Sequence, residues 1–578
     1  MFSKLLLANR GEIAVRVART CRDLGVRVVA VYSDADRNAP YLDWADEAYA
    51  LGGRLPSETY LDIGKLLEVA RRSGAQAVHP GYGFLAEHPG FAAACIEEGL
   101  VFVGPSPRAI ELMGDKVVSR RLARDAGVPL VPGTGPINTA GDALRFAAEH
   151  GYPLAIKAAA GGGGRGLRIV HRESEVIAAL EAARREGQFY FGNPTVYVER
   201  FLDDPKHVEI QLVGTCTGEV LALGERDCSV QRRHQKLIEE TPGPTVSPEI
   251  RERLESAAIR LAEAVGYRGA GTVEFLLEPG GQFYFLEMNT RIQVEHPVTE
   301  VVRSCDLVAM QLGIAAGEPV EMPGEARGHA LECRINAEDV AAGFRPVTGK
   351  LAELREPSGP GVRVDSGVRA GYVVPPEYDS LLAKLVVWGG SREEARTRML
   401  RALREYMVEG VPTTIPAHER VLRHEEFIAG SVGTAFLERE HDALFGDLAP
   451  YPLTHLTAHE EEQARRTVVE VNGRRYEVAL YEQPGASSAS SRRPKPSLHR
   501  AGGRGAARGP TLVSPLQGSV ARVAVRDGDA VRKGDLVCVL EAMKMENELH
   551  AHKDGTVANV RVQVGESVSV GSPLLDIV

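Results

Sequence analysis

The sequence lacks the features that mark secreted, membrane or nucleic-acid-binding proteins. It has only seven cysteines among 578 residues, with no CxxC pair, so neither a disulfide framework nor a zinc site is expected. No apolar run approaches membrane-spanning length, and residues 5–7 are too short for a signal segment. The net charge of −10 argues against nucleic acid as the main partner. We therefore expect a cytoplasmic protein with reduced thiols that contacts neither membranes nor nucleic acid.

Two common nucleotide-binding signatures are also missing, the Gly-Lys-Ser/Thr of the Walker loop and the Rossmann glycine spacing. Instead, an apolar strand at residues 154–158 runs into four consecutive glycines at residues 161–164. A flexible surface hairpin is one interpretation. However, Lys157 lies in the apolar strand and needs an anionic partner. Glycine loops let backbone N–H groups close over phosphates, so the pair predicts a phosphate site.

The N-terminal segment has the pattern of a parallel α/β sheet. A strand at residues 4–8, a helix at 12–24 and a strand at 26–32 form a βαβ unit. Residues 77–84 and 100–104 look like two further strands that end in loops, where parallel sheets gather their ligands. A helix capped by Ser106 and a second one starting at Asp115 are expected to follow.

A predicted hairpin carries two acidic residues in apolar surroundings. The strands at residues 272–278 and 282–289 place Glu274 nearly opposite Glu287. A water-exposed cross-strand pair is the alternative, but two carboxylates among Phe, Leu and Val would repel each other without a cation. With the Asn289 carbonyl they suit magnesium or manganese. Residues 231–236 (QRRHQK) form a basic cluster, which on its own would be a solvated charge run.

The C-terminal part contains a repeat around one lysine. Gly518, Gly528 and Gly534 recur as Gly555, Gly565 and Gly571 among short alternating strands, as in a β-sandwich. Lys544, in the sequence AMKM, falls between the two halves, where a hairpin would expose it. Upstream, residues 467–480 predict a hairpin with an Asn-Gly turn, and residues 483–510 read as a flexible linker.

Two resemblances follow from these motifs. Residues from about 511 to 578 resemble the biotin carrier domain, in which the lysine that matches Lys544 carries biotin; lipoyl domains share the fold but usually have Asp-Lys at this point. Residues 1–446 resemble biotin carboxylase of the ATP-grasp superfamily, through motifs at 79–84, 199–211, 225–240, 287–300 and 332–339. The resemblance implies an α/β ATP-grasp fold followed by a small all-β flattened sandwich.

The implied domains run in order along the chain. They are an N-terminal α/β domain (1–115), an ATP-grasp domain (116–330) with a lid (about 131–204), a C-terminal α+β domain (331–446), a connector with a hairpin (447–482), the linker (483–510) and the carrier (511–578).

The resemblance also assigns roles to matching residues. Phosphates are held by Lys116, Lys157, Gly162, Gly163, Gly164, Gly166, His207 and Lys236. Glu199, Leu202 and Leu276 belong to the adenine and cofactor pocket, and Gln231 and His234 lie by the ribose. Glu274, Glu287 and Asn289 bind the metals, while Arg291, Gln293, Val294 and Lys236 hold bicarbonate. Glu295 is the base, and Arg334 with Tyr82 faces the biotin ring. Arg200 is expected to contact the adenine mainly through its backbone.

The implied activity is ATP- and bicarbonate-dependent carboxylation of the chain's own biotin. Glu295 would deprotonate bicarbonate, which attacks ATP, and Arg334 would stabilise the biotin enolate. Because no carboxyltransferase domain is recognised, a separate β subunit is expected to take the carboxyl group to acetyl- or propionyl-CoA. A biotin protein ligase and a second copy of the chain are further expected partners. A split pyruvate carboxylase is the alternative, and an ATP-grasp ligase with a lipoyl-like binding module is a second one.

Overall fold

The computed structural model describes residues 1–158, 167–191, 193–451, 465–471, 474–480, 510–514, 518–542, 545–568 and 571–578. Several predicted features lie outside these ranges: Gly162, Gly163, Gly164, Gly166, Lys544, the Asn-Gly turn and nearly all of the linker. The chain divides into two compact units, Met1–Tyr451 and Pro452–Val578, each described by itself.

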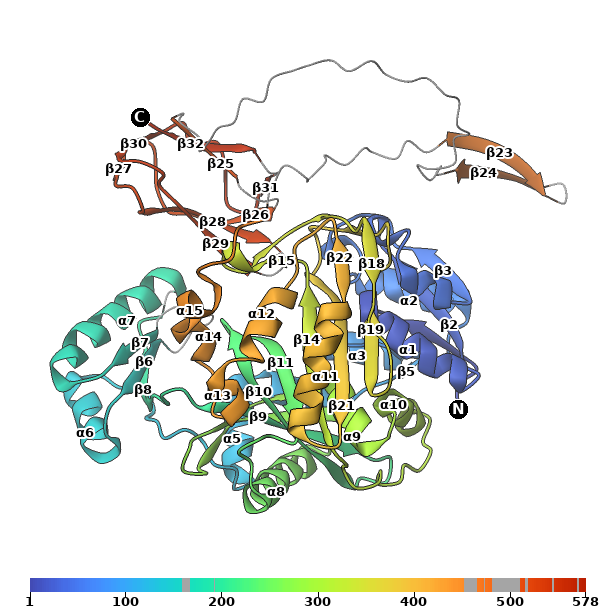
Figure 1. Ribbon diagram of the computed structural model, residues 1–578, viewed down its shortest axis with the longest axis horizontal. Coiled ribbons are helices and arrows are strands. Elements are labelled where there is room, and N and C mark those ends of the chain that lie inside the picture. Colours follow the sequence, from blue (N-terminus) through green and yellow to red (C-terminus); the bar gives the residue numbers. More distant parts are fainter. Residues whose placement is uncertain are drawn as a thin grey trace. The chain divides into compact units, whose positions relative to one another are not determined.

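The first unit begins with the predicted parallel sheet (Figure 1). Its strand order is β3-β2-β1-β4-β5, and every neighbouring pair is parallel. The strands are β1 (Lys4–Leu7), β2 (Arg27–Tyr32), β3 (Glu47–Ala50), β4 (Ala77–His79) and β5 (Val101–Phe102), and the helices α1 (Gly11–Asp23), α2 (Ile63–Ser73) and α3 (Pro89–Glu97). Glu12 therefore follows β1 and Tyr82 follows β4, both at the carboxyl edge of the sheet, where ligands are expected.

Two capped helices lead from this sheet to the rest of the unit. Ser106 accepts a hydrogen bond from the backbone of Ala109 (3.2 Å) and caps α4 (Pro107–Gly114). Asp115 accepts two such bonds from the first turn of α5 (Lys116–Asp125). Both predicted helix starts are confirmed, and the second cap fixes Lys116 at the first position of α5.

A small lid follows, with a core of its own. Strands β6 (Leu154–Ala158), β7 (Leu167–Val170) and β8 (Val196–Arg200) form an antiparallel sheet in the order β7-β6-β8. Helices α6 (Ala140–His150) and α7 (Val176–Phe191) cover it, with Phe146, Leu154, Val176 and Val196 in the core. The lid is the teal part at the left of Figure 1.

The centre of the first unit is an antiparallel sheet of eight strands, in the order β13-β12-β9-β10-β11-β14-β21-β19. Its strands are β9 (Lys206–Gly214), β10 (Val220–Arg232), β11 (Gln235–Thr241), β12 (Gly269–Leu277), β13 (Phe283–Asn289), β14 (His329–Asn336), β19 (Val362–Ser366) and β21 (Leu381–Gly389). Helices α8 (Pro248–Ala264) and α11 (Arg392–Glu405) pack against its apolar face. The opposite face carries polar side chains from β9, β10, β11, β12 and β14, so residues far apart in sequence meet there.

Shorter elements complete this unit. They are α9 (His296–Arg303), α10 (Leu307–Ala315), α12 (Ile415–Val421), α13 (Glu425–Ala429), α14 (Phe436–Arg439), α15 (His441–Phe445), β15 (Glu338–Asp339), β16 (Arg345–Pro346), β17 (Gly349–Lys350), β18 (Glu353–Arg355), β20 (Val373–Val374) and β22 (Met407–Glu409). None of the helices in the described ranges is long and apolar enough to cross a membrane.

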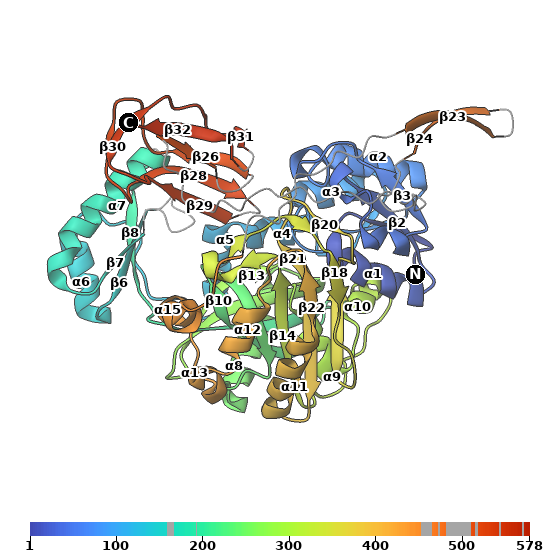
Figure 2. The ribbon, with the colours of Figure 1, turned by 45° about the horizontal axis from the view of Figure 1, so that its top comes forward.

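The second unit contains the predicted hairpin and the β-sandwich. β23 (Arg465–Val471) pairs antiparallel with β24 (Arg474–Leu480). The sandwich has two four-stranded sheets, β25-β32-β30-β27 and β29-β28-β26-β31 (Figure 2). Its strands are β25 (Thr511–Val513), β26 (Gly518–Val523), β27 (Ala530–Val531), β28 (Leu536–Ala542), β29 (Met545–His550), β30 (Gly555–Ala558), β31 (Ser567–Val568) and β32 (Pro573–Ile577).

The sequence repeat corresponds to a repeat in backbone conformation. Gly528 and Gly534 have φ angles of 95° and 97°, and their counterparts Gly565 and Gly571 have 88° and 83°. Only glycine adopts this region without strain, so the spacing of these glycines marks the turns of both halves. β28 and β29 pair up to Ala542 and Met545; the prediction for Lys544 falls outside the described residues.

Candidate active site

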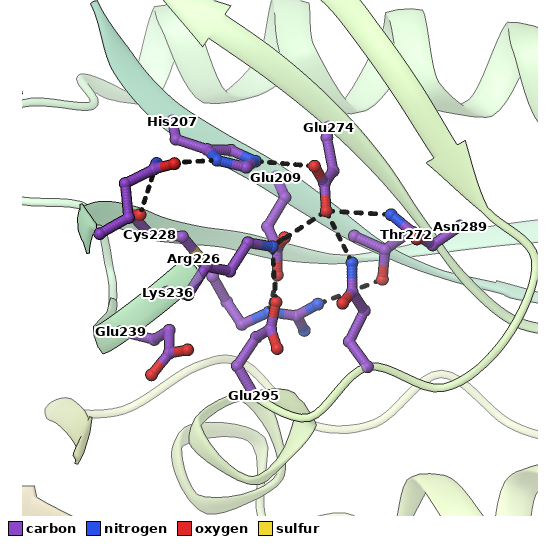
Figure 3. A network of polar contacts seen from close by, with 12 residues as sticks. His207, Glu209, Arg226, Cys228, Lys236, Glu239, Thr272, Glu274, Asn289 and Glu295 are labelled. Atoms are coloured by element: carbon purple, nitrogen blue, oxygen red, sulfur yellow. Dashed lines mark hydrogen bonds and ion pairs between the residues drawn. The ribbon is translucent and has the colours of Figure 1, made fainter. Parts of the chain in front are cut away.

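Lys236 lies at the centre of the polar face of the large sheet (Figure 3). Its ammonium group donates to Glu209 (2.6 Å), Glu274 (2.9 Å) and Glu295 (2.7 Å). Burial alone would lower the pKa of Lys236, but the three carboxylates raise it well above its ordinary value. Lys236 is therefore a fixed positive charge, and the three anions around it come from two strands, β9 and β12, and from the loop before α9.

Glu295 is fully buried and lies between two cations, immediately before helix α9. One oxygen accepts from Lys236 and the other from Arg334 (2.8 Å). Burial raises the pKa of this carboxyl group, but Lys236, Arg334 and Arg226 outweigh it and hold the pKa well below the ordinary range. Glu295 is thus ionised at neutral pH and poised beside two positive charges.

A fully buried arginine, Arg226, holds the side chains around this centre in place. Arg226 donates to Glu209 (2.5 Å), to Gln211 (2.7 Å) and to the hydroxyl groups of Thr272 (3.1 Å) and Thr299 (3.0 Å). It fixes the carboxylate that in turn holds Lys236. The sequence analysis missed Arg226, although an arginine inside a buried strand already requires such partners.

The predicted metal-binding hairpin is confirmed in its register, because Glu274 pairs directly with Glu287 across β12 and β13. Glu274 accepts bonds from His207 (2.8 Å), Asn289 (2.9 Å) and Gln293 (2.8 Å) as well as from Lys236. Glu287 is exposed, and desolvation together with the Glu274 carboxylate raises its pKa. Two like charges and an amide oxygen fit a magnesium or manganese ion, which would relieve their repulsion.

The segment after the hairpin turns its side chains toward the same centre. Arg291 pairs with Glu87 (2.9 Å) and with the side-chain oxygen of Asn289 (3.0 Å). The backbone carbonyl of Val294 accepts from Lys384 (3.0 Å). Gln293 and Glu295 thus contact Glu274 and Lys236 directly, and Arg291 is linked to the same hairpin through Asn289.

Tyr82 is linked to the segment at residues 291–295 through two buried charged residues, Glu12 and Lys384. Its hydroxyl group donates to Glu12, and Glu12 pairs with Lys384 (3.1 Å), which holds Val294. Lys384 is fully buried and connects the first helix of the parallel sheet with the segment at Val294. It was not predicted from the sequence, because Glu12 and Val294 lie far from it along the chain.

A second group of contacts lies at the lid. Glu199 pairs with Lys157 (2.5 Å) and with Arg120 on α5 (2.9 Å). Arg120 lies one helical turn after Lys116, so both cations are on the same side of α5; Arg120 was not predicted. The Arg200 side chain pairs with Glu278 (2.5 Å), and its backbone N–H donates to the Pro132 carbonyl (2.9 Å).

The remaining predicted residues surround these two groups. Gln231 is buried and contacts the second ring nitrogen of His207 (3.2 Å). Leu202 is buried, Leu276 is half-buried, and Lys116 and His234 are exposed. His234 has a φ of 65° in the turn between β10 and β11. Within the described ranges no hydrogen bond or ion pair joins the Glu199 group to the Lys236 group.

The sequence matches four family descriptions. They are "Biotin carboxylase, N-terminal domain" at residues 1–110, "Carbamoyl-phosphate synthase L chain, ATP binding domain" at 115–322, "Biotin carboxylase C-terminal domain" at 332–439 and "Biotin-requiring enzyme" at 510–577. The biotin carboxylase domain of 2-oxoglutarate carboxylase from Hydrogenobacter thermophilus has the same fold (TM-score 0.71, 45% identity, covering 78% of this chain and 99% of that one).

These matches, with the fold and the centre described above, define an ATP-dependent biotin carboxylase joined to a biotin carrier domain. The biotin-dependent acyl-coenzyme A carboxylase alpha3 subunit of Mycobacterium leprae is 46% identical over 591 residues, which cover 100% of this chain and 98% of the relative. One of the subunits of pyruvate carboxylase from Methanothermobacter thermautotrophicus is 53% identical, over 76% of this chain and 90% of the relative. The chain belongs to the family of biotin-dependent acyl-CoA carboxylase alpha subunits.

Proposed function

We propose that this chain uses ATP and bicarbonate to carboxylate biotin on Lys544 and that a separate carboxyltransferase subunit passes the carboxyl group to an acyl-CoA. The observation that carries the proposal is the placement of Glu295 between Lys236 and Arg334. A base held between two cations suits a substrate that is an anion and becomes more negative when it loses a proton.

Bicarbonate is proposed to bind beside Glu295, held by Arg291, Gln293 and the segment at Val294. The low pKa of Glu295 keeps the carboxylate ionised, so that it can accept the bicarbonate proton. Lys236 and Arg291 stabilise the charge that this transfer creates. Lys384 supports the geometry, because it fixes the Val294 carbonyl from behind.

ATP is proposed to bind between the lid and the large sheet. Lys116, Lys157, His207, Lys236 and the glycine loop would hold phosphates, with the base near Glu199, Leu202 and Leu276 and the ribose near Gln231 and His234. Glu274, Glu287 and Asn289 would hold magnesium or manganese, which supplies charge neutralisation at the phosphates. In support, the related Hydrogenobacter domain was solved with MgADP and bicarbonate.

Biotin supplies the nitrogen atom that accepts the carboxyl group. Arg334 and Tyr82 are proposed to face its ring, because Arg334 bonds Glu295 and Tyr82 is linked to Val294 through Glu12 and Lys384. We further propose a cytoplasmic location, a biotin protein ligase that loads Lys544, and a homodimer; the related domain was described as a dimer. All seven cysteines are free, which agrees with a reducing compartment.

The test is a reconstitution with the purified full-length chain. With ATP, magnesium and labelled bicarbonate, it should fix label on free biotin and release ADP in step. Avidin blotting should detect biotin on the chain. Label fixed by a chain that carries no biotin and receives no free biotin would contradict the proposed activity. ADP release that does not depend on bicarbonate would contradict it as well.

Pyruvate is a second candidate acceptor, since the Methanothermobacter pyruvate carboxylase chain is 53% identical over 442 residues. Co-purification with the carboxyltransferase, followed by assays with acetyl-CoA, propionyl-CoA and pyruvate, separates the two. We expect label in an acyl-CoA; transfer to pyruvate alone would replace the first proposal with the second.

Replacing the linker, residues 483–510, with a Gly/Ser segment of equal length should leave overall carboxylation within about threefold of wild type, because a segment with few apolar residues acts through its reach. A flexible coil of this length would span roughly 30 Å on average and ~90 Å when stretched. Cutting it to about ten residues limits the reach to roughly 35 Å and should slow transfer. Both variants should carboxylate free biotin normally. An inactive Gly/Ser variant beside an active short one would show that the linker sequence docks specifically.

A further inference from the structure

Two carboxyl groups stand next to each other in the sheet behind Arg334. Glu239 on β11 and Glu332 on β14 are directly paired in register, so their side chains lie on the same face with Cβ atoms about 5 Å apart. Both residues are 0% exposed. Neither has a role in the activity proposed for this chain.

These carboxyl groups are short of hydrogen-bond donors. One oxygen of Glu239 accepts from Arg334, at 2.6 Å from Nε and 2.5 Å from Nη2. The other oxygen of Glu239 and both oxygens of Glu332 have no hydrogen-bond partner among the described residues. Buried acceptors without donors are costly. A proton on one carboxyl group would turn an acceptor into a donor for its neighbour.

The charges around the pair cannot neutralise two anions. Arg334 is shared with Glu295 (2.8 Å), and Lys384 is engaged by Glu12 (3.1 Å). Burial first, and then the Arg334 and Glu295 charges, set the pKa of Glu239 at about 7. Burial and the Glu239 carboxylate raise the pKa of Glu332 well above its ordinary value.

Other titratable groups from the packed elements are already engaged or uncharged. Lys236 is held by its three carboxylates, and burial raises the pKa of the Cys228 thiol on β10. On α9, His296 bonds the Gln293 carbonyl (2.7 Å), and Glu300 pairs with Arg16 (2.6 Å) and Arg363 (2.8 Å). None of these supplies the missing donor to Glu332.

We propose that Glu239 and Glu332 share one proton and act as positioning residues for Arg334. With one negative charge, the pair balances Glu295, which shares the Nη2 atom of Arg334 with Glu239, so the guanidinium group stays bonded to both. Loss of the shared proton would double the negative charge behind Arg334 and draw it toward the sheet, away from Glu295 and the biotin ring. This inference rests on the role proposed above for Arg334.

The test compares Glu332→Gln with wild type across the pH range, in the full-length protein with free biotin. In wild type, kcat should fall as the pH rises above neutrality, by up to about tenfold per pH unit beyond the ionisation, and ADP release should become uncoupled from biotin carboxylation. Glutamine cannot ionise, so Glu332→Gln should lack this alkaline fall. Glu338→Gln is the matched control, since Glu338 is also buried with a raised pKa but bonds to Ser380 and Asn336.

Thermal unfolding gives an independent readout. A carboxyl group whose pKa is raised in the folded state stabilises the fold most at low pH, and this contribution is lost as the pH rises through the folded value. Glu332→Gln should therefore raise the melting temperature relative to wild type increasingly toward alkaline pH. A difference that stays constant with pH would overturn the shared proton.

Infrared spectroscopy decides the matter even if the variant does not fold. Wild type at neutral pH should show the C=O stretch of a protonated carboxyl group that disappears over the same pH range as the coupled activity. The same alkaline fall in Glu332→Gln, or no such band in wild type, would overturn the inference. If wild type fixes no label on biotin, the proposed function is wrong. The infrared band still tests, independently, whether Glu239 and Glu332 share a proton.

Discussion

Lys544→Arg should abolish biotin incorporation and with it all carboxylation of the final acceptor. Arginine keeps the positive charge but has no primary amine that a biotin protein ligase could acylate. Ala542 and Met545 pair at the ends of β28 and β29, so the sandwich around position 544 should remain intact. Carboxylation of free biotin should persist at the wild-type rate, because Glu295, Lys236 and Arg334 belong to a different compact unit.

The readouts are mass spectrometry of the intact chain and two activity assays. Lys533→Arg, at an exposed position of the same sandwich, is the matched control and should keep biotin and both activities. Biotin found on Lys544→Arg would show that another lysine is the carrier. Loss of free-biotin carboxylation in this variant would instead link the sandwich to the chemistry itself.

The elements that the sequence predicted well are those set by local pattern. The βαβ start, the caps at Ser106 and Asp115 and the glycine turns of the sandwich depend on residues only a few positions apart. The pairing of Glu274 with Glu287 also depends on one short turn, and the structure has the predicted register. Hydrophobic periodicity and turn chemistry suffice for such features.

The supporting charges of the centre could not be predicted in this way. Arg226 on β10 bonds Thr272 on β12, because both strands are neighbours of β9 in the sheet. Lys384 pairs with Glu12, although most of the first unit separates them in sequence. Such contacts depend on strand order between distant segments, which a single sequence does not display. A buried arginine or lysine in a strand signals that partners exist but not which ones. Glu332 lies inside the motif at residues 332–339. That its carboxylate oxygens lack hydrogen-bond donors is apparent only from the structure, in which it pairs with Glu239.

The boundary predicted between residues 116–330 and 331–446 falls within the large sheet, which runs without interruption from β13 to β19. β11 and β14 are neighbours in it, and their pairing brings Arg334 to Glu295. The proposed base and the residue proposed to face biotin are thus held against one continuous sheet. This arrangement gives positional precision that two separately mobile domains could not provide.

Glu287→Lys should remove nucleotide-dependent activity while the fold persists. Glu287 is exposed at the edge strand of the sheet, so a lysine there creates no buried charge. It would, however, replace a proposed metal ligand with a cation beside Lys116, whose charge already acts on Glu287. Even changes behind the direct ligands of metal sites cost about 10- to 100-fold, so we expect a loss of at least about 100-fold in both ATP cleavage and biotin carboxylation.

Titration calorimetry with MgATP and with ATP in chelator separates the metal effect from general damage. Magnesium should strengthen ATP binding to wild type and have little effect on Glu287→Lys. Glu252→Lys, an equal charge reversal at an exposed position of α8, should behave as wild type, and both variants should keep the wild-type circular dichroism spectrum. Because Glu274 remains tied to Lys236 and His207 in the variant, wild-type magnesium dependence in Glu287→Lys would mean that the metal does not use this hairpin pair.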